Sequence, residues 1–401
     1  MACSKYLFLN ICLFILLLSF SISSAHDKPH NSTKSKSPKS CPPPPSNEYK
    51  NCFSKVFAFG DSYTDTGNAY FMGGLGSFLA CFSHSHYGST FFRRPSNRLC
   101  NGRLVIDFIT EALGLQNLPP YKDTAVNFTH GCNFAIAGST SFSGNFFLHN
   151  KIHHSLMWKE VPESFRTQIE WFRKFLSNVE CQGEDDVSCK SKLKDVLFWI
   201  GPMGISDYTL TFEFSISQKW QINIQVDHVC QLVKANLEKG AKYIVVQGLP
   251  PAGCLPFDLS LSKPGDRDEM GCSASVNSMI VKHNELLQKK LKEIQKTYPS
   301  CMIVYADLWN AFKTILTNPS KFGIEETSKT CCGCGFGELN FDSKKLCSSN
   351  GATVCSNPSK YIHWDGVHLT EAMNQHIADL LFRQGFCHPS FDQQASHRKS
   401  L

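Results

Sequence analysis

The stretch KVFAFGDSYTDTGN, Lys55 to Asn68, places a short apolar run directly before a group of small and polar residues. A run that is apolar at nearly every position predicts a parallel strand buried on both faces, because helices cover each side of such a strand. The run ends at Gly60, and Ser62 follows two residues later. The sequence therefore places a serine hydroxyl just beyond the carboxyl end of a buried strand.

Further runs along the chain repeat this strand pattern and are separated by longer helix-type segments. The apolar runs are DVLFWIG (195–201), AKYIVVQG (241–248) and CMIVYAD (301–307), and the helical patterns lie at 102–114, 220–241 and 273–298. A last helix is expected to begin after Thr370, a residue suited to an N-cap, and to end near Gly385. Strands that alternate with helices predict a three-layer α/β/α fold with a central parallel sheet. Functional loops in such folds follow the carboxyl ends of the strands.

The opening stretch contains two patterns that belong to different chemistries. Asp65-Thr66-Gly67 matches the tripeptide of aspartic proteases, but these enzymes need a second carboxylate, normally from a second such loop. The chain holds no second D-T-G or D-S-G tripeptide. We therefore expect Asp65 and Gly67 to shape a turn, with help from Asn68. Ser62 then remains as the candidate nucleophile.

A serine nucleophile needs a histidine that takes its proton and a carboxylate that orients the histidine. The segment Asp365 to His368, D-G-V-H, supplies both, because a D-G turn can fold the carboxylate back onto the imidazole. The D-x-x-H spacing is common, and a structural turn with a surface histidine is the simpler interpretation of this motif alone. Its place at the entrance to the last helix, together with Ser62 at the first strand end, favours a Ser62–His368–Asp365 triad.

Six segments, taken in order, are similar to the motifs of one known family. They are FAFGDSYTDTGN (57–68), YGSTFFRRPSNRLCNGRLVIDFI (87–109), HGCNFAIAGS (130–139), VVQGLPPAGCLP (245–256), CCGCGFGELNFD (331–342) and NPSKYIHWDGVHLTEA (357–372). The chain resembles a plant GDSL-type esterase/lipase of the SGNH hydrolase superfamily from about Phe53 to Phe386. The resemblance implies a flavodoxin-like SGNH-hydrolase fold and the hydrolysis of carboxylic esters without metal or cofactor. The G-x-S-x-G elbow of other α/β-hydrolases is absent.

The resemblance also implies a role for individual residues. Ser62 would be the nucleophile, His368 the general base and then the general acid, and Asp365 the residue that orients the imidazole. The backbone N–H groups of Ser62 and Gly138 would donate to the oxyanion of the tetrahedral intermediate.

The chain departs from the family pattern at three positions. Tyr63 stands where the family name has leucine, and Asn97 replaces the first glycine of a G-R-x-x-[ND]-G-R-L segment. Ser206, in IGPMGISDY, replaces the asparagine that donates to the oxyanion. A serine hydroxyl is shorter than an asparagine amide, and loss of one oxyanion donor typically costs about 10²- to 10³-fold in rate. Ser206 could donate directly, could hold a water that donates, or could mark a weakly active or non-catalytic member.

The N-terminus indicates a secreted protein. Residues 1–25 have one lysine, an apolar run and a small-residue end, as in a signal peptide that is cleaved after Ala25. Residues 26–51 are rich in Pro, Ser and Lys and predict a disordered linker; residues 52–390 are expected to form the hydrolase domain and residues 391–401 a C-terminal tail. Asn31 and Asn127 lie in N-glycosylation sequences. The expected destination is the extracellular cell wall or apoplast, with the vacuole as the alternative.

Cysteine usage agrees with an oxidising compartment. The chain has 19 cysteines, of which Cys3 and Cys12 belong to the signal peptide, so the odd number that remains leaves at least one thiol unpaired within the chain. The C-C-G-C segment at 331–334 lacks zinc-type spacing, and disulfides to residues such as Cys347 or Cys355 are the favoured interpretation. We expect no metal site, from these cysteines or from scattered histidines such as His84, His86, His153 and His154.

The remaining features limit the substrate and partner classes. No basic helix with interleaved aromatic residues suggests nucleic acid, and no apolar stretch beyond the N-terminal run is long enough for a stable membrane span. The expected substrate is a small acylated metabolite, a lipid or a cell-wall acyl ester. An acyltransferase on the same triad and a non-catalytic binding or defence protein remain as alternatives. Five phenylalanines that follow the site loops belong either to the core or to an acyl pocket: Phe142, Phe146, Phe147, Phe212 and Phe214.

Overall fold

The computed structural model describes residues 49–72, 86–149, 164–211, 216–335 and 337–399. Within them, a six-stranded sheet has the order β10-β5-β4-β3-β1-β2. Its strands are β1 (Lys55–Phe59), β2 (Gly131–Asn133), β3 (Val196–Ile200), β4 (Tyr243–Gln247), β5 (Met302–Ala306) and β10 (Cys387–His388). The four strands that the apolar runs predict are β1, β3, β4 and β5, and all four are confirmed.

The order β2-β1-β3-β4-β5 is that of a flavodoxin-like doubly wound sheet, and these five strands are parallel. Only the edge strand β10 runs antiparallel, against β5. The prediction of a central parallel sheet is therefore confirmed, with one short antiparallel strand added at its edge.

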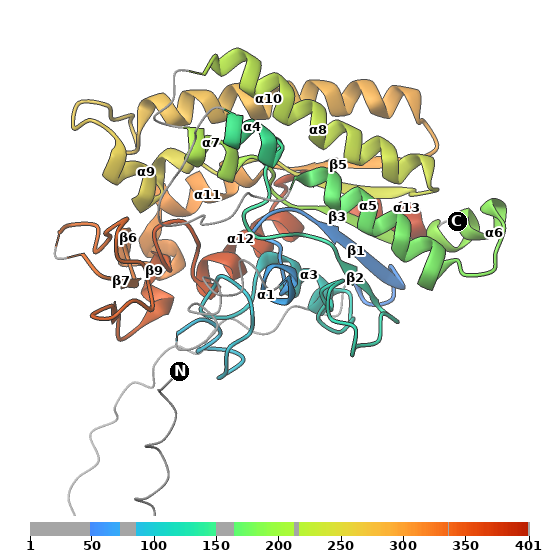
Figure 1. Cartoon of the computed structure of the whole chain (residues 1–401), viewed down its shortest axis with the longest axis horizontal. Helices are drawn as coiled ribbons and strands as arrows, with labels where there is room; N and C mark the ends of the chain where they lie inside the picture. Colours follow the sequence, from blue (N-terminus) through green and yellow to red (C-terminus); the bar gives the residue numbers. More distant parts are fainter. Residues whose placement is uncertain (1–48, 73–85, 150–163, 212–215, 336, 400–401) are drawn as a thin grey trace, which may run out of the picture. The chain divides into compact units, whose positions relative to one another are not determined.

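Helices cover both faces of the sheet, as Figure 1 shows. One face carries α5 (Phe165–Phe175), α8 (Gln218–Glu238) and α10 (Ala274–Thr297), and the other carries α3 (Val105–Ala112), α11 (Leu308–Thr317), α12 (Glu371–Arg383) and α13 (Phe391–Lys399). Shorter helices are α1 (Asn68–Phe71), α4 (Gly144–His149), α6 (Asp186–Leu193), α7 (Ile205–Thr211) and α9 (Pro256–Leu261). The predicted N-cap at Thr370 is confirmed, because its side chain accepts a hydrogen bond from the Met373 N–H.

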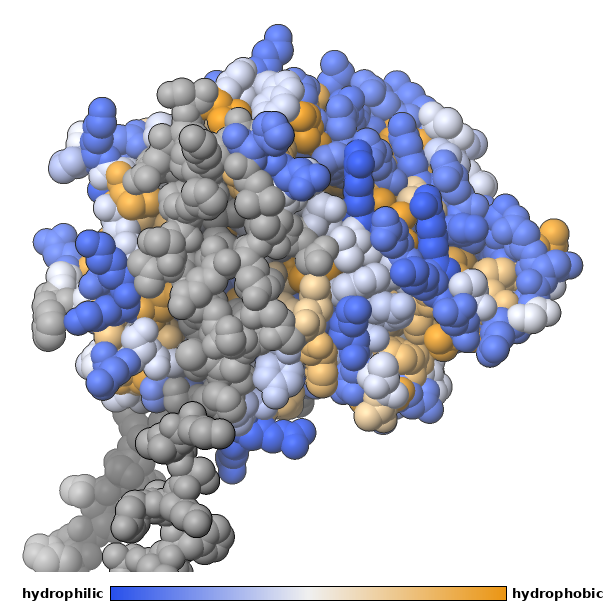
Figure 2. Space-filling model, viewed as in Figure 1, coloured by the Kyte–Doolittle hydropathy of each residue, from blue (hydrophilic) through white to orange (hydrophobic). Residues whose placement is uncertain are grey.

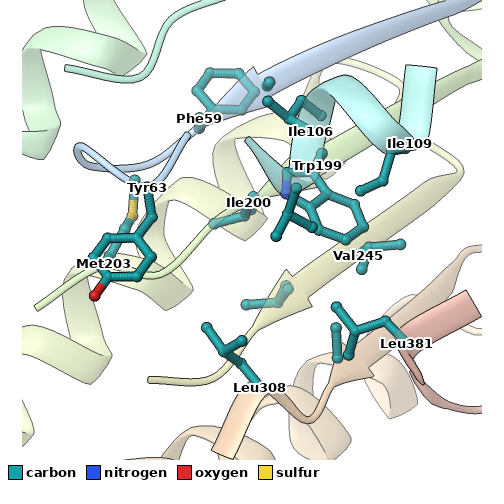
Figure 3. Close-up of a cluster of buried hydrophobic side chains, with 14 of the residues drawn as sticks. Phe59, Tyr63, Ile106, Ile109, Trp199, Ile200, Met203, Val245, Leu308 and Leu381 are labelled. Atoms are coloured by element: carbon teal, nitrogen blue, oxygen red, sulfur yellow. The ribbon is translucent and has the colours of Figure 1, made fainter. Parts of the chain in front are cut away.

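The central strands bury side chains on both faces. On one face, Phe57 of β1 packs edge-to-face against Phe198 of β3 and Phe172 of α5. On the other, Trp199 lies near Ile106 and Ile109 of α3, as Figure 3 shows, and its ring centroid lies 6.5 Å from that of Phe382 of α12. Each fully buried side chain of this size stabilises the fold by about 1.5–3 kcal/mol relative to exposure. Because Phe198 and Trp199 point to opposite faces of the sheet, each packs against a different helix layer.

The two ends of the described domain pack together. Tyr49 and Phe391 are buried, and their rings meet edge-to-face with centroids 5.0 Å apart. The Tyr49 hydroxyl also donates to Asp392. Residues 391–399, expected as part of a tail, therefore form helix α13 with its first residue in the core. The expected signal peptide and most of the expected linker, including Asn31, lie outside the described residues.

Four disulfides lie in the described part of the chain: Cys181–Cys189, Cys254–Cys272, Cys331–Cys355 and Cys332–Cys347. The last two confirm the interpretation of the C-C-G-C segment. They belong to a lobe that contains the two-stranded sheets β6 (Glu326–Thr330) with β9 (Tyr361–His363), and β7 (Cys332–Gly333) with β8 (Thr353–Val354). This lobe leads directly into the segment that carries Asp365 and His368.

The face in Figure 2 is mainly hydrophilic where it is coloured, with scattered hydrophobic patches. In the ranges that the structure describes, no helix is both long enough and apolar enough to cross a membrane.

Candidate active site

The structure brings Ser62, His368 and Asp365 together at the carboxyl edge of the sheet. Ser62 Oγ lies 2.9 Å from His368 Nε2. On the other side of the ring, His368 Nδ1 lies 2.9 Å from Asp365 Oδ2 and 3.0 Å from Oδ1. With the Nδ1 proton facing the carboxylate, Nε2 is left to accept the hydrogen bond of the serine hydroxyl. This is the arrangement that a histidine needs to take a proton from a serine.

The turn between β9 and α12 holds the carboxylate and the imidazole in this relation. Asp365 Oδ1 accepts from the backbone N–H groups of Val367 and His368, at 2.8 and 2.7 Å. The His368 carbonyl in turn accepts from the Trp364 N–H at 2.8 Å. These bonds close a tight turn between Trp364 and His368. In this turn the carboxylate of Asp365 lies against the imidazole three residues later.

These contacts also determine the charge of the acid. Burial by itself would raise the pKa of Asp365, but the charge of His368 and hydrogen bonds from His368 and Val367 outweigh it and lower the pKa to about 2. Asp365 is therefore ionised across the neutral range. An ionised carboxylate can stabilise the imidazolium that forms when His368 takes up a proton.

The turn after β1 carries Ser62. Gly60 has φ of 148° and Gly201 lies beside it; a side chain at either position would collide with Thr64, whose Oγ1 would be 2.9 and 1.9 Å from the added Cβ. The N–H groups of Thr64 and Asp65 both donate to the Asp61 carbonyl, at 3.0 Å. The chain therefore makes a tight turn at Ser62, and this residue is 7% exposed.

Tyr63, the residue that replaces the family's leucine, joins the serine turn to the histidine turn. Its hydroxyl donates to the Val367 carbonyl at 2.7 Å, across 304 positions in sequence. Its ring centroid lies 6.0 Å from that of His368. Leucine could fill part of this space but could not make the hydrogen bond, so Tyr63 is a link that this chain adds between its two site segments.

The loop with Gly138 lies beside the serine turn. The Ile136 N–H and the Ser139 hydroxyl both donate to the Gly60 carbonyl, at 3.1 and 3.2 Å, and the Ala137 N–H donates to Asp65 at 2.8 Å. Gly138 itself has φ of 78°, a left-handed conformation that favours glycine. Residues on both sides of Gly138 are therefore tied to the turn that carries Ser62.

Asp65, the aspartate of the D-T-G tripeptide, organises this part of the site. Its carboxylate accepts from four backbone N–H groups, those of Gly67, Asn68, Ala69 and Ala137. The first three shape the turn, as we expected from the sequence. The fourth bond, to the residue before Gly138, is one that sequence reasoning missed, because a contact across 72 positions leaves no local pattern.

Ser206 lies in the first turn of α7 and is buried. Its neighbour Asp207 reaches across to the Gly138 loop, where its two carboxylate oxygens both lie 2.9 Å from the Ser141 N–H and one lies 3.3 Å from the Phe142 N–H. The loops that carry Gly138 and Ser206 are therefore fastened to each other. Within the described residues, the backbone N–H groups of Ser62 and Gly138 donate to no backbone carbonyl.

Two buried carboxyls next to the site have raised pKa values. Burial raises the pKa of Asp61 from 3.8 to about 7, although the hydrogen bond from the Tyr63 N–H and the charge of His368 both lower it. Burial likewise raises the pKa of Asp207 to about 7, against the N–H groups of Ser141 and Phe142, and the charge of Asp61 adds to the rise. Asp61 Oδ2 has no hydrogen-bond partner within the described segments. These two carboxylates accept their hydrogen bonds from the backbone N–H groups of Tyr63, Ser141 and Phe142.

The aromatic residues after the Gly138 loop form a cluster of their own. Phe142 is buried and stacks on Phe146 and on Trp220, with ring centroids 4.2 and 5.4 Å apart. Phe147 packs beside them, while Phe212 and Phe214 lie outside the described residues. No group of three or more metal-ligating side chains gathers in the part of the chain that the structure describes. Of the histidines considered as ligands, only His86 belongs to that part.

A serine, a histidine and an aspartate joined at the carboxyl edge of an α/β/α sheet have the layout of a serine hydrolase. Residues 56–381 match the model of the GDSL-like lipase/acylhydrolase family. A GDSL esterase/lipase of Arabidopsis thaliana is 42% identical over 346 residues, which cover 84% of this chain and 88% of the relative. Acetylajmalan esterase 1 of Rauvolfia serpentina is 34% identical over 333 residues, which cover 82% and 86%.

The chain belongs to the GDSL-like lipase/acylhydrolase family, and it is a carboxylic ester hydrolase.

Proposed function

We propose that the protein is a secreted serine esterase that hydrolyses acyl esters through Ser62, His368 and Asp365 and a covalent acyl-enzyme. The observation that carries this proposal is the unbroken chain of contacts from Ser62 Oγ through the two ring nitrogens to the carboxylate. The lowered pKa of Asp365 supports it, because an ionised carboxylate at Nδ1 leaves Nε2 as the proton acceptor.

In the proposed reaction, Ser62 Oγ attacks the carbonyl carbon of the ester while His368 Nε2 takes the hydroxyl proton. The carbonyl oxygen becomes an oxyanion, and the N–H groups of Ser62 and Gly138 donate to it. Collapse of the intermediate breaks the bond to the alcohol, which receives its proton from His368. Water then attacks the acyl-Ser62 ester by the same sequence, releases the acid and restores the serine.

Ser206 is proposed as the third member of the oxyanion site. Its side chain is buried at the start of α7, and a serine hydroxyl can turn about its C–O bond toward a bound substrate. A single hydroxyl on a short side chain is a weaker donor than a fixed asparagine amide. We therefore expect this enzyme to turn over slowly for its family.

The proposed substrate is an acylated small molecule, with lipid and cell-wall acyl esters as the other two classes to test. A relative that is 34% identical over most of both chains is named an acetylajmalan esterase, which favours a short acyl group such as acetyl. The aromatic cluster around Phe142 follows the Gly138 loop directly, and we propose that it contacts the alcohol part of the ester.

Secretion is proposed from residues 1–25, and four disulfides in the described residues suit an oxidising compartment. Asn127 is exposed and thus accessible for glycosylation. Expression of the full chain in plant cells, followed by N-terminal sequencing of the wall and medium fractions, is expected to give a mature start at His26. Retention of residues 1–25 would contradict this proposal.

The test of the chemistry is covalent labelling. The purified protein is treated with a fluorophosphonate and assayed on p-nitrophenyl acetate, with Ser62→Ala, His368→Ala and the surface variant Ser177→Ala as the series. We expect one label on the peptide with Ser62, loss of label and activity in the first two variants, and wild-type behaviour in the third. Activity that persists in folded Ser62→Ala would overturn the triad. Product analysis with an added acceptor alcohol separates hydrolysis from acyl transfer, and a protein that neither labels nor turns over is a non-catalytic member.

A further inference from the structure

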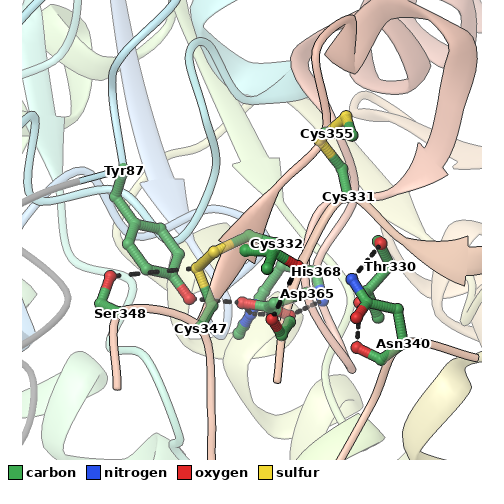
Figure 4. The surroundings of a disulfide bond; sticks show 12 residues. Tyr87, Thr330, Cys331, Cys332, Asn340, Cys347, Ser348, Cys355, Asp365 and His368 are labelled. Atoms are coloured by element: carbon green, nitrogen blue, oxygen red, sulfur yellow. Dashed lines mark hydrogen bonds and ion pairs between the residues drawn. A yellow bond between two sulfur atoms is a disulfide. The ribbon is translucent and has the colours of Figure 1, made fainter. Parts of the chain in front are cut away.

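The Asp365 carboxylate has a donor that lies outside its own turn. Oδ1 accepts from the backbone N–H groups of Val367 and His368, whereas Oδ2, the oxygen nearer to His368 Nδ1, accepts from the hydroxyl of Tyr87 at 2.7 Å. This bond spans 278 positions in sequence, and both side chains are buried. Figure 4 shows the hydroxyl of Tyr87 directed at Asp365.

The phenol can act only as a donor here. Burial raises the pKa of Tyr87 far above its usual value, and the charge of Asp365 and the hydrogen bond to it raise it further. Because Tyr87 keeps its proton and Asp365 is ionised, the bond is charge-assisted. Such bonds are shorter and roughly twice as strong as those between neutral groups.

The surroundings of Tyr87 hold its ring in one place. It packs edge-to-face on Trp364, the residue before the acid, with centroids 5.9 Å apart. The same cluster contains the disulfide Cys332–Cys347. The Cys332 N–H donates to the Trp364 carbonyl at 2.7 Å, so the disulfide lobe holds the backbone that leads into Asp365.

The loop that carries Tyr87 is anchored independently of this lobe. The Gly88 N–H donates to the Cys100 carbonyl at 2.9 Å, and the Thr90 N–H donates to the Asn101 carbonyl at 2.9 Å. Thr90 and Arg103 also bond the carboxylate of Glu371, in the first turn of α12. Tyr87 therefore connects the loop at 87–103 with the disulfide lobe, and its hydroxyl donates to the carboxylate of Asp365.

We propose that Tyr87 is a positioning residue for ester hydrolysis: its hydroxyl fixes the rotation of the Asp365 carboxylate so that Oδ2 faces His368 Nδ1. This inference rests on the proposed triad. The terminal torsion of an aspartate is broad, and the two backbone donors hold only Oδ1. Without the phenol, Oδ1 stays near Nδ1 at 3.0 Å with its two backbone donors, but Oδ2 is no longer fixed against the ring of His368.

The hydrogen bond also draws negative charge away from the oxygen that faces the imidazole. Its loss leaves a stronger negative potential at His368, which favours the protonated ring. The acidic limb of the rate profile therefore moves to higher pH when the donor is removed. The other titratable groups that interact with this acid and ring are Asp61, Tyr63 and His363. All three stay unchanged in the variants below.

The experiment compares Tyr87→Phe with Tyr49→Phe, using a p-nitrophenyl ester from pH 5 to 9. Tyr49 is a matched control, because it is also buried and its hydroxyl also donates to an aspartate, Asp392, in the contact between the chain ends. We expect kcat to fall about tenfold in Tyr87→Phe with KM within about twofold, and the acidic limb of kcat/KM to move up by about half a pH unit. Tyr49→Phe should retain the wild-type kcat and profile.

A second change keeps the proposal testable if Tyr87→Phe does not fold. Replacement of Tyr87 by 3-fluorotyrosine makes the phenol more acidic and a stronger donor while it keeps the ring in place, so the acidic limb should move to lower pH. Wild-type kcat and pH profile in either folded variant would overturn the role of Tyr87. Ser62→Ala, run in the same assay, tests the triad itself: if it is inactive while Tyr87→Phe behaves as wild type, only the inference about Tyr87 fails.

Discussion

The carboxyl of Asp61 allows a stability prediction in which both the sign and the size follow from burial. The side chain is fully buried, and burial raises its pKa from 3.8 to about 7. A native state with the higher pKa binds the proton more tightly than the unfolded chain does. The stabilisation by this proton is complete below pH 3.8 and is lost as the pH rises toward 7.

The size of the effect comes from the same two values. At 1.36 kcal/mol for each pH unit, the difference between 3.8 and about 7 corresponds to roughly 4 kcal/mol, of which about 3 kcal/mol falls between pH 4.5 and 7.5. Asparagine keeps the oxygen that accepts from the Tyr63 N–H and cannot ionise. We therefore expect the unfolding free energy of Asp61→Asn, taken relative to wild type, to be about 3 kcal/mol higher at pH 7.5 than at pH 4.5.

The assay is guanidinium unfolding followed by tryptophan fluorescence at several pH values in this interval, with the disulfides oxidised. Asp185→Asn is a control of opposite sign. Asp185 is exposed, and hydrogen bonds from Ser188 lower its pKa, so its contribution is present at neutral pH and lost in acid. If the difference between Asp61→Asn and wild type is the same at pH 4.5 and 7.5, the buried carboxyl does not hold its proton and the reasoning is wrong.

Two further predictions concern the oxyanion loop and the disulfide lobe. Ser206→Asn should raise kcat for p-nitrophenyl acetate by about tenfold or more by restoring a fixed amide donor; an unchanged or lower kcat in the folded variant would count against a role of Ser206 in the rate. Removal of Cys332–Cys347 by double alanine substitution should lower the unfolding free energy by about 3 kcal/mol and also lower kcat, because this disulfide packs beside Tyr87. The matched control removes Cys181–Cys189, which lies on the segment that leads into the start of β3, at the end of the strand away from the site. This change should lower the unfolding free energy and leave kcat unchanged. An equal loss of kcat in the two double variants would contradict a specific effect of Cys332–Cys347 on the site.

Local patterns in the amino-acid sequence are enough to predict the layers and the candidate residues. Continuous apolar runs such as Val196 to Ile200 identify strands that are buried on both faces, and a polar residue such as Thr370 at a helix start identifies a cap. Both signals are local. Ser62 at a strand end and Asp365 with His368 in a short D-G turn are local patterns too, but only their occurrence together in one chain favours a triad.

The surroundings of these residues depend on contacts between distant parts of the chain. Strands β2 and β10, with three and two residues, are too short to show a hydrophobic pattern in the sequence. They form because they pair with the longer strands β1 and β5 in the folded sheet. The bonds from Tyr87 to Asp365 and from Ala137 to Asp65 join positions far apart in the chain. A hydrogen bond needs two atoms within about 3 Å, and such proximity between distant residues arises only when the whole fold packs.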